Sequence, residues 1–176
     1  MQYTTYDGSP LGPILLAADE IGLTGLWLEG QKYFAVHRAE ENTQPEGDGC
    51  ENRELPVFEA AKRWLDIYFS GQEPDVEVPI HLIGTEFQQE VWKILCEIPY
   101  GQTITYGQIA RQIAERRDKK TMSAQAVGGA VGRNPISIIV PCHRVVGRDG
   151  SLTGYAGGIE KKIFLLELEG KQKDFA

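Results

Sequence analysis

Cys142 and His143 are the neighbouring side chains in this sequence best suited to nucleophilic chemistry. An apolar run over 136–140 precedes them, and its composition predicts a buried extended strand. Pro141 has no backbone N–H for a strand ladder, so we expect the strand to end there. The thiol would then lie where rigid structure gives way to a loop, a common position for reactive groups.

The residues that follow this cysteine favour an activated thiol. Arg144 and the basic segment around it would lower the pKa of Cys142 and raise its thiolate fraction. Neighbouring side chains on an extended segment point to opposite sides, so His143 would accept the thiol proton through a bridging water. The imidazole also needs an acceptor to orient it, and many carboxylates are candidates. Cys50 and Cys96 are expected to be small buried hydrophobes.

The charges of the chain are unevenly distributed. The net charge of −7 by itself argues against nucleic acid as a partner. Residues 1–99 carry a net charge of −12, whereas residues 100–150, which contain Cys142, carry +5. A local basic face can bind phosphate groups even on an acidic protein. By charge alone, a solvated surface explains the basic segment equally well.

Length and composition predict a globular protein of one or two domains, with 176 residues, 41% of them apolar and 24% charged. No apolar run approaches the roughly 18 residues of a membrane span, and the N-terminus has no signal-peptide pattern. Three widely spaced cysteines indicate reduced thiols. We therefore expect a cytoplasmic protein. We expect no metal site, because no CxxC or HxxxH spacing occurs.

The first third of the chain combines strand signals with one helix. Short antiparallel strands are predicted over 14–18 and 23–28, and a polar, acidic loop over 38–54. A helix is predicted over 55–69 because apolar residues recur on one face. That face consists of Phe58, Ala61, Leu65 and Tyr68.

A proline-punctuated stretch after Gly71 predicts a connection between two domains, 1–82 and 83–176. The second domain opens with two capping boxes, Thr85–Gln88 and Thr105–Gln108, each followed by helical apolar periodicity. These signals predict two helices, the first ending before Pro99.

A basic turn over 116–120 leads from the second of these helices to a third, predicted over 123–132. Helix, short turn and helix in a basic context form the outline of a helix-turn-helix, although helical hairpins are common. A last helix is predicted over 159–169. Its inner face would consist of Ile159, Ile163 and Leu166.

The helix predicted over 123–132 consists mainly of alanine and glycine. Gly128 and Gly129 each cost roughly 1 kcal/mol relative to alanine in a helix interior, so a compensating interaction is expected. Close packing against a neighbouring helix is one explanation. Close approach to DNA is the other, because an ordinary helix is about 10–12 Å wide and the minor groove about 6 Å wide.

Several motifs of the second domain together resemble one family. The segment Pro141–Arg144 (PCHR) is preceded by Asn134–Pro135 and followed by Gly154–Gly158 (GYAGG) and Leu165–Gly170 (LLELEG). This set, within residues 85–170, resembles the O6-alkylguanine-DNA alkyltransferases. The resemblance implies an N-terminal ribonuclease H-like α/β domain. It also implies a mainly helical, winged-helix-like C-terminal domain with a helix-turn-helix.

The resemblance implies roles for five residues at the reactive centre. Cys142 would accept the alkyl group, His143 would activate the thiol through water, and Glu169 would orient His143. Asn134 would hold the turn between the DNA-reading helix and the active-site segment. Tyr106 would push at the target phosphate and hydrogen-bond the guanine.

Substrate contacts are implied in the same way. Tyr155 would line the nucleobase pocket, and the backbone of Ala156 would face the guanine oxygen. The carbonyls of Cys142 and Val145 would accept hydrogen bonds from the guanine amino group. Some relatives have a hydroxyl residue at the position of Ala156, where this chain offers only its backbone N–H.

The resemblance places Gln125, Ala126, Gly129 and Arg133 at the DNA interface, with Ala126 and Gly129 along the minor groove. The family usually has an arginine at the position of Gln125, which fills the gap left by the flipped base. Glutamine is shorter and uncharged. We therefore expect DNA affinity to be weaker or to depend more on other contacts.

The implied function is irreversible transfer of an alkyl group from O6-alkylguanine, or O4-alkylthymine, in double-stranded DNA to Cys142 after base flipping through the minor groove. The thioether product is not hydrolysed, so each molecule would react once, as a monomer without cofactor or metal. Three alternatives are a catalytically silent binder of alkylated DNA, a cysteine hydrolase or acyltransferase, and a helix-turn-helix regulator with an incidental thiol.

Overall fold

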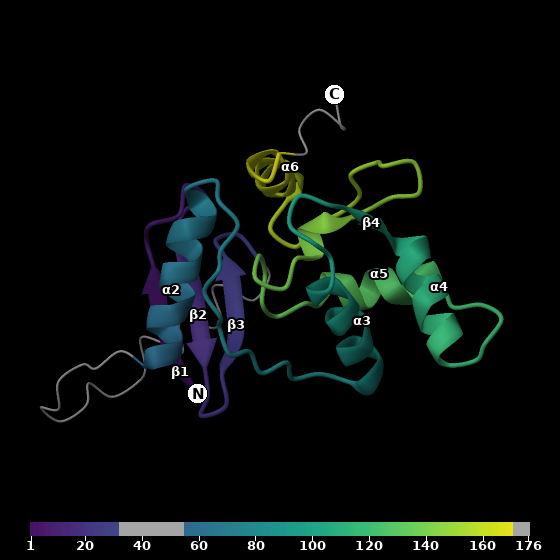
Figure 1. Cartoon of the computed structure of the whole chain (residues 1–176), viewed down its shortest axis with the longest axis horizontal. Helices are drawn as coiled ribbons and strands as arrows, with labels where there is room; N and C mark the ends of the chain where they lie inside the picture. The colour runs from purple at the N-terminus through teal and green to yellow at the C-terminus, as the bar shows by residue number, and fades with distance from the viewer. Residues whose placement is uncertain (32–54, 171–176) are drawn as a thin grey trace, which may run out of the picture. The chain divides into compact units, whose positions relative to one another are not determined.

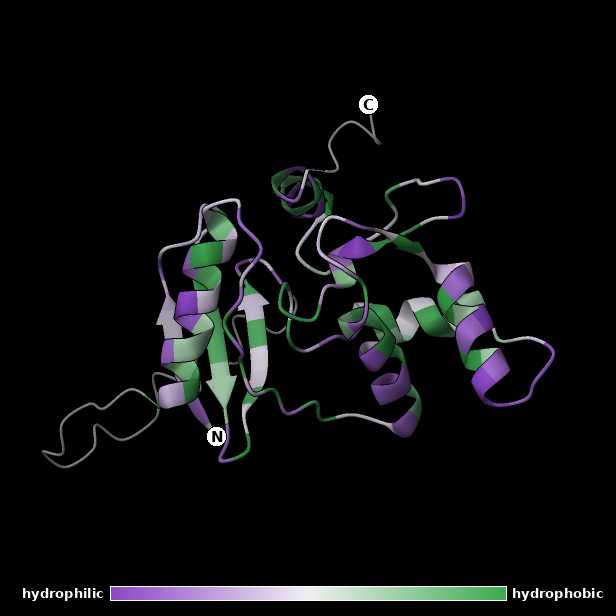
Figure 2. Ribbon diagram, viewed as in Figure 1, coloured by the Kyte–Doolittle hydropathy of each residue, from purple (hydrophilic) through white to green (hydrophobic). Residues whose placement is uncertain are grey.

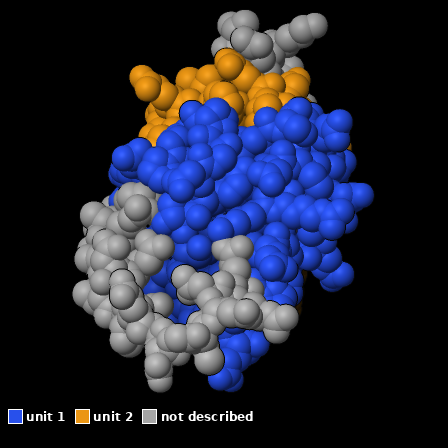
Figure 3. Space-filling view, turned by 90° about the vertical axis from the view of Figure 1, so that its left-hand side faces the viewer, with its two compact units in different colours: residues 1–82 blue, residues 83–176 orange. Residues whose placement is uncertain are grey.

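The computed structural model describes residues 1–31 and 55–170. The chain divides into two compact units, residues 1–82 and residues 83–176 (Figures 1 and 3). The expectations for the loop over 38–54 and for Cys50 lie outside the described residues.

An antiparallel sheet is the framework of the first unit. It contains β1 (Gln2–Tyr6), β2 (Ile14–Ala18) and β3 (Leu23–Leu28) in that order. The strands predicted over 14–18 and 23–28 are thereby confirmed. Both are buried along their whole length, which agrees with their nearly continuous apolar sequence. A register shift between Ala17 and Ala18 interrupts the pairing of β2 with β3.

One described helix, α2 (Pro56–Phe69), packs against β2 and β3 (Figure 1). Figure 2 shows the separation of hydrophobic and hydrophilic residues around this helix. Burying each large apolar side chain of the inner face stabilises the unit by about 1.5–3 kcal/mol. The buried residues are those predicted, Phe58, Ala61, Leu65 and Tyr68.

The chain that follows α2 adds to the edge of the same sheet. The Leu23 N–H donates to the Pro79 carbonyl at 2.8 Å, and the His81 N–H donates to the Leu23 carbonyl at 2.7 Å. This pairing is parallel. His81 Nδ1 also lies 2.6 Å from a carboxylate oxygen of Asp19, so the end of the unit is tied to the turn between β2 and β3.

Three helices dominate the second unit: α3 (Glu86–Cys96), α4 (Tyr106–Arg116) and α5 (Ala124–Gly132). Both predicted capping boxes are present at the starts of α3 and α4. They fix where these helices begin, because each satisfies two backbone N–H groups that a helix start leaves unpaired. Cys96 is exposed, so the prediction that it is buried is wrong; it lies at the last position of α3, off the apolar face.

Helices α3 and α4 both pack against α5, which gives the predicted helix-turn-helix outline over α4 and α5. The Trp92 indole N–H donates to the Ala130 carbonyl at 2.9 Å and is buried. A short parallel pair joins β4 (Ile104–Thr105) to β5 (Val145–Val146). This pair holds the start of α4 beside the segment that follows Cys142.

The inner face of the last helix, α6 (Ile159–Leu168), differs from the prediction. Ile159 is 38% exposed, whereas Lys162 is fully buried beside Leu165 and Leu166. Leu166 is buried as predicted, but the prediction for Ile159 is wrong, and apolar periodicity could not place a lysine in the core. A buried lysine must find hydrogen-bond acceptors, and Lys162 does so at the candidate site described below.

Gly25 in β3 tests the packing of the first unit. A Cβ added there would lie 2.0–2.5 Å from the Trp27 indole, and both residues are buried. We predict that Gly25→Ala lowers the free energy of unfolding by about 1–3 kcal/mol through overpacking. Denaturant unfolding followed by tryptophan fluorescence measures the effect. A matched control is Gly129→Ala, whose added Cβ meets nothing within 4 Å; equal midpoints for the two variants would contradict the prediction.

Candidate active site

Asn134 holds a compact turn where the sequence predicted a strand. Its Nδ2 donates to the carbonyls of Val140 and Ile136 at 2.7 and 3.3 Å, and its Oδ1 accepts the Ile136 N–H at 3.0 Å. Ile138 adopts a φ of 69°, which is unusual for a β-branched residue. The extended strand over 136–140 is therefore a wrong prediction. The apolar residues are buried by a turn closed around Asn134 instead.

Pro141 leads into a single 3₁₀ turn, Cys142–Arg144, whose three side chains are all buried. Successive residues of a 3₁₀ turn are about 120° apart. Cys142 and His143 therefore point in different directions, although the segment is not extended as predicted. Proton transfer between them through water stays a prediction.

Glu169 is a buried anion on which two side chains converge. His143 Nε2 lies 3.2 Å from its Oε1, and Arg144 Nε donates to both carboxylate oxygens at 3.0 and 3.1 Å. Burial raises the pKa of Glu169, but the hydrogen bonds from His143 and Arg144 outweigh it and lower the pKa to about 2. Glu169 is thus a carboxylate that can only accept, so the proton on the imidazole belongs on Nε2.

His143 is held as a neutral base. Burial lowers its pKa, and the positive charges of Arg144 and Lys162 lower it further, against the opposing effect of Glu169. With the proton on Nε2, the lone pair is on Nδ1. A neutral imidazole of fixed tautomer is the form that can accept a proton from a thiol.

Cys142 is a neutral thiol in the resting protein. Burial raises its pKa, and a hydrogen bond from Asn134, the charge of Lys162 and nearby backbone N–H groups offset this only in part. The prediction of a lowered pKa for this thiol is therefore wrong, because burial outweighs the lowering effect of Lys162. The guanidinium of Arg144 is directed at Glu169 rather than at the sulfur, so its charge is already compensated.

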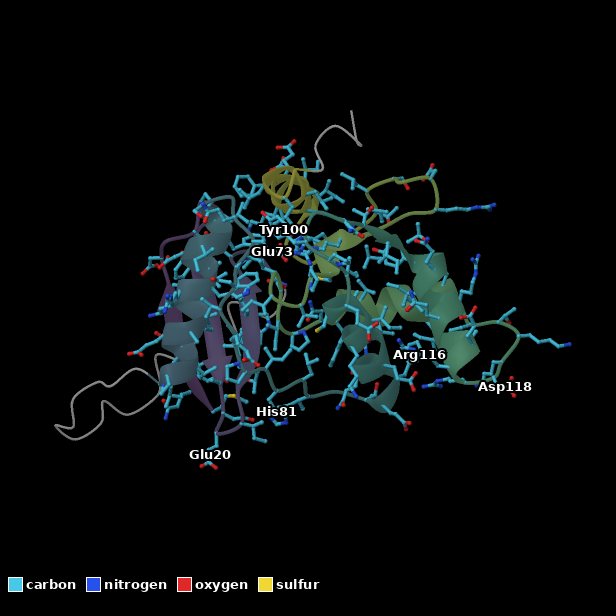
Figure 4. All side chains as sticks on the ribbon, in the orientation of Figure 1. Glu20, Glu73, His81, Tyr100, Arg116 and Asp118 are labelled. Atoms are coloured by element: carbon cyan, nitrogen blue, oxygen red, sulfur yellow. The ribbon has the colours of Figure 1, made fainter. Side chains whose placement is uncertain are left out.

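Arg144 carries a positioning role that the sequence did not reveal. Besides Glu169, it donates through Nη1 to the Ile98 carbonyl at 2.8 Å. Its guanidinium carbon also lies 5.7 Å from the ring centre of Tyr100, which Figure 4 labels. Arg144 thereby ties the turn after α3 to the end of α6. The arginine of the PCHR motif and the second glutamate of the LLELEG motif are the sequence signals from which this pairing could have been predicted.

Lys162 is a second residue that the sequence analysis missed. Its Nζ donates to the carbonyls of Val145, Thr153 and Gly154 at 2.6, 3.2 and 3.4 Å. Burial lowers its pKa to about 8, and only the ionised form of Cys142 would oppose that shift. The lysine pins the glycine-rich loop to β5. The expected contact of the Val145 carbonyl with guanine stays a prediction, and it would use the carbonyl's second lone pair.

A cavity of about 200 Å³ opens onto the sulfur. It brings together four of the predicted residues, Cys142, Tyr106, Tyr155 and Ala156. The remaining lining residues are Gly128, Val131, Gly132 and Gly154. Asn134, His143 and Glu169 are buried and are not among the residues that line the cavity; their action on Cys142 stays a prediction.

Two tyrosines give the cavity hydroxyl donors. The Tyr106 hydroxyl donates to the Thr153 carbonyl at 3.4 Å, the same carbonyl that Lys162 binds. Burial raises the pKa of Tyr106, and it raises the pKa of Tyr155 well above its usual value. Both hydroxyls therefore keep their protons at neutral pH.

The outer face of α5 is open. Gln125, Ala126, Gly129 and Arg133 are exposed, and a Cβ added at Gly129 meets nothing within 4 Å. Close packing against a neighbouring helix is thus the wrong explanation for Gly129. At Gly128 an added Cβ would lie 3.9 Å from the Tyr106 ring, an ordinary contact. Figure 2 shows little hydrophilic colour along α5.

Within residues 1–31 and 55–170, no group of three or more His, Cys, Asp or Glu side chains is placed to hold a metal ion. In the same part of the chain, no helix is long and apolar enough to cross a membrane. The expected absence of a metal and of a cofactor remains a prediction for the protein as a whole.

Comparison with known families covers both units. The ribonuclease-like domain of 6-O-methylguanine DNA methyltransferase matches residues 1–82, and the DNA binding domain of the same family matches residues 86–171. The chain belongs to the 6-O-methylguanine DNA methyltransferase family. The resemblance inferred from PCHR, GYAGG and LLELEG is confirmed, as is the fold class of an N-terminal α/β domain and a mainly helical C-terminal domain.

Individual members of the methyltransferase family match over nearly their full lengths. A methylated-DNA–protein-cysteine methyltransferase of Methanosarcina acetivorans is 46% identical, with 97% of this chain and 99% of the relative covered. The crystal structure of the Mycobacterium tuberculosis O6-methylguanine methyltransferase is 44% identical, with a TM-score of 0.76 and coverage of 97% and 93%. A structure of Mycobacterium tuberculosis OGT in complex with DNA is 43% identical, with a TM-score of 0.75 and coverage of 98% and 94%.

The paired Glu169 carboxylate should make the second unit sensitive to acid. Its pKa falls from 4.5 to about 2 on folding, so its stabilising contribution is present above pH 4.5 and is lost as the pH falls toward 2. We predict that wild type exceeds Glu169→Gln in free energy of unfolding, and that this difference shrinks over that range by on the order of 3 kcal/mol. Urea titrations of both proteins at a series of pH values measure it. A difference independent of pH would contradict the assignment.

Proposed function

We propose that this protein repairs DNA by transferring the alkyl group of O6-alkylguanine, and also of O4-alkylthymine, to Cys142 in an irreversible, single-turnover reaction. The observation that most supports this reaction is a cavity lined by Cys142 together with Tyr106 and Tyr155. The paired side chains of His143 and Glu169 are buried. The family of the chain, and relatives named methylated-DNA–protein-cysteine methyltransferases, support the same reaction. The proposal places it in the cytoplasm, on double-stranded DNA, as a monomer.

The reaction follows from the protonation states of the site. The Cys142 proton passes to Nδ1 of His143 through a water molecule, and Glu169 stabilises the imidazolium that forms. The sulfur attacks the alkyl carbon, a carbon–sulfur bond forms, and the bond from that carbon to the guanine O6 breaks. The Tyr106 hydroxyl donates a hydrogen bond to the departing guanine. The proton held by the imidazolium returns through water and Tyr106 to the guanine, which ends with one proton in place of the alkyl group and leaves His143 and Tyr106 neutral.

The product explains why the protein acts once. An alkyl thioether has no carbonyl group for water to attack, and the site supplies no second nucleophile to the sulfur-bound carbon. The thiol is therefore not regenerated, and one protein molecule is consumed for each lesion. This distinguishes the site from a cysteine hydrolase, in which a thioester must be hydrolysed at an oxyanion hole.

The alkylated base must leave the base stack of the DNA before it can reach Cys142. Flipping costs a few kcal/mol, least for a damaged base, and the cavity offers Tyr155 as a lining ring and the Ala156 backbone N–H as a donor toward O6. Val145 supplies a carbonyl toward the guanine amino group. Asn134 follows α5 and closes the turn that leads to Cys142, so it fixes the position of the sulfur relative to the end of that helix.

The open face of α5 is the proposed contact with the minor groove. Ala126 and Gly129 add almost no width to the helix, so it can approach the groove more closely than an ordinary helix. Gln125 would take the space of the flipped base through its amide, and Arg133 would contact the backbone. Since glutamine carries no charge, other cations must supply more of the affinity for DNA.

The direct test is to incubate the full-length protein with a duplex that contains O6-methylguanine and to weigh the intact protein. We expect one added methyl group, located on Cys142 by peptide mapping, and none in Cys142→Ser. Binding of the duplex without a mass change would favour the silent lesion binder. Demethylation of more than one equivalent of DNA would contradict single turnover.

Gly129 separates the demands of folding from those of DNA binding. Its added Cβ meets nothing within 4 Å, so Gly129→Ala should raise the free energy of unfolding by roughly 0.5–1 kcal/mol through helix propensity. The same methyl group would project into the minor groove and weaken binding to duplex DNA. Thermal unfolding and a DNA titration on the same sample measure both effects. A variant that is more stable and binds DNA as tightly as wild type would contradict this placement of the helix.

A further inference from the structure

The turn between α4 and α5 contains four cations, and two of them are bound within the protein. Arg117 Nε donates to a carboxylate oxygen of Glu90 at 3.0 Å, and its guanidinium lies 5.5 Å from the Phe87 ring centre. Arg116 lies 3.5 Å from a carboxylate oxygen of Glu97. Both arginines therefore fasten α4 to α3, and their charges are largely compensated.

Lys119 and Lys120 differ from the arginines. Both are exposed, and within residues 55–170 the structure records no ion pair or side-chain hydrogen bond for either. The chain reaches them through Asp118, whose φ of 52° ends α4. Figure 4 labels Arg116 on α4 and Asp118 at the end of the helix, where the turn projects away from α4.

The two lysines stand at one end of the open face of α5. They precede Ser123, the N-cap of that helix, and the exposed positions Gln125 and Gly129 continue along it to Gly132, which lines the cavity. The nine residues of α5 span about 12 Å between its first and last Cα atoms at 1.5 Å per residue. A DNA strand that presents its base to Cys142 and follows this face reaches the lysines.

We propose that Lys119 and Lys120 form a binding site for the phosphate backbone of DNA next to the N-terminal end of α5. The proposal rests on the proposed function, because it assumes that α5 lies along the DNA. At 3.4 Å of helix axis per nucleotide, the length of α5 alone corresponds to between three and four nucleotides, and the lysines precede its first residue, so the contacted phosphate is roughly three to five nucleotides from the flipped base. The site recognises phosphate oxygens and is therefore independent of sequence.

The salt dependence of binding tests this site. Equilibrium binding of undamaged duplex is measured over a range of salt concentrations for wild type, for the double variant Lys119→Gln, Lys120→Gln and for Arg116→Gln. Losing a phosphate contact lowers the slope of log K against log salt by about 0.9, so we expect the double variant to lose about two units. Arg116→Gln removes the same kind of charge from the same turn, and we expect its slope to match wild type.

Two further readouts keep the outcomes distinct. Uncharged methylphosphonate linkages placed roughly three to five nucleotides from an O6-methylguanine should weaken binding of wild type but not of the double variant. At saturating duplex, the double variant should still take up one methyl group. If the double variant takes up the methyl group and its salt slope equals that of wild type, the lysine site is overturned and the proposed function stands. Absence of methyl uptake by wild type would overturn the proposed function, whatever the slopes.

Discussion

A buried carboxylate is the constraint on which the active site depends. Glu169 could not remain charged in the core without partners, because an unpaired buried charge is prohibitively costly. Arg144 supplies the compensating charge and His143 a hydrogen bond. The ion pair of Arg144 with Glu169 joins the end of α6 to the 3₁₀ turn, and Arg144 also anchors the turn after α3 through the Ile98 carbonyl. The contact of Glu169 with His143 Nε2 sets which imidazole nitrogen carries the proton. Removing either charged partner would disturb packing and protonation together.

The site combines this rigid interior with an open surface. Lys162 fixes the glycine-rich loop by three carbonyl contacts, and Asn134 fixes the turn before the cysteine. On the outer side, Gly129 lowers the stability of α5 relative to alanine, and no close packing within the described residues requires a glycine there. Such a cost is expected where a surface is shaped for a partner rather than for stability. A neutral Cys142 thiol, whose pKa burial raises, fits the proposal that the buried imidazole must remove its proton before it reacts.

Local signals in the sequence were sufficient for much of the fold. The capping residues Thr85 and Thr105 act within one helical turn, and the apolar face of α2 follows from simple periodicity, so both could be predicted. The motif around Cys142 identified the family. The turn over 136–140 could not be predicted, because it depends on hydrogen bonds from Asn134 to residues up to six positions away. The burial of Lys162 and the raised pKa of Cys142 depend on tertiary packing, to which sequence periodicity is blind.

The central claim is that Glu169 holds His143 as a neutral imidazole with its proton on Nε2, ready to accept the thiol proton at Nδ1. Nitrogen-15 NMR of the histidine side chains measures this directly. The chain has three histidines, and the His143 signals are assigned by comparison with His143→Gln. At neutral pH we expect a protonated Nε2 and an unprotonated Nδ1 in wild type, and a smaller population of this tautomer in Glu169→Gln. A resting imidazolium, or a proton on Nδ1, would contradict it.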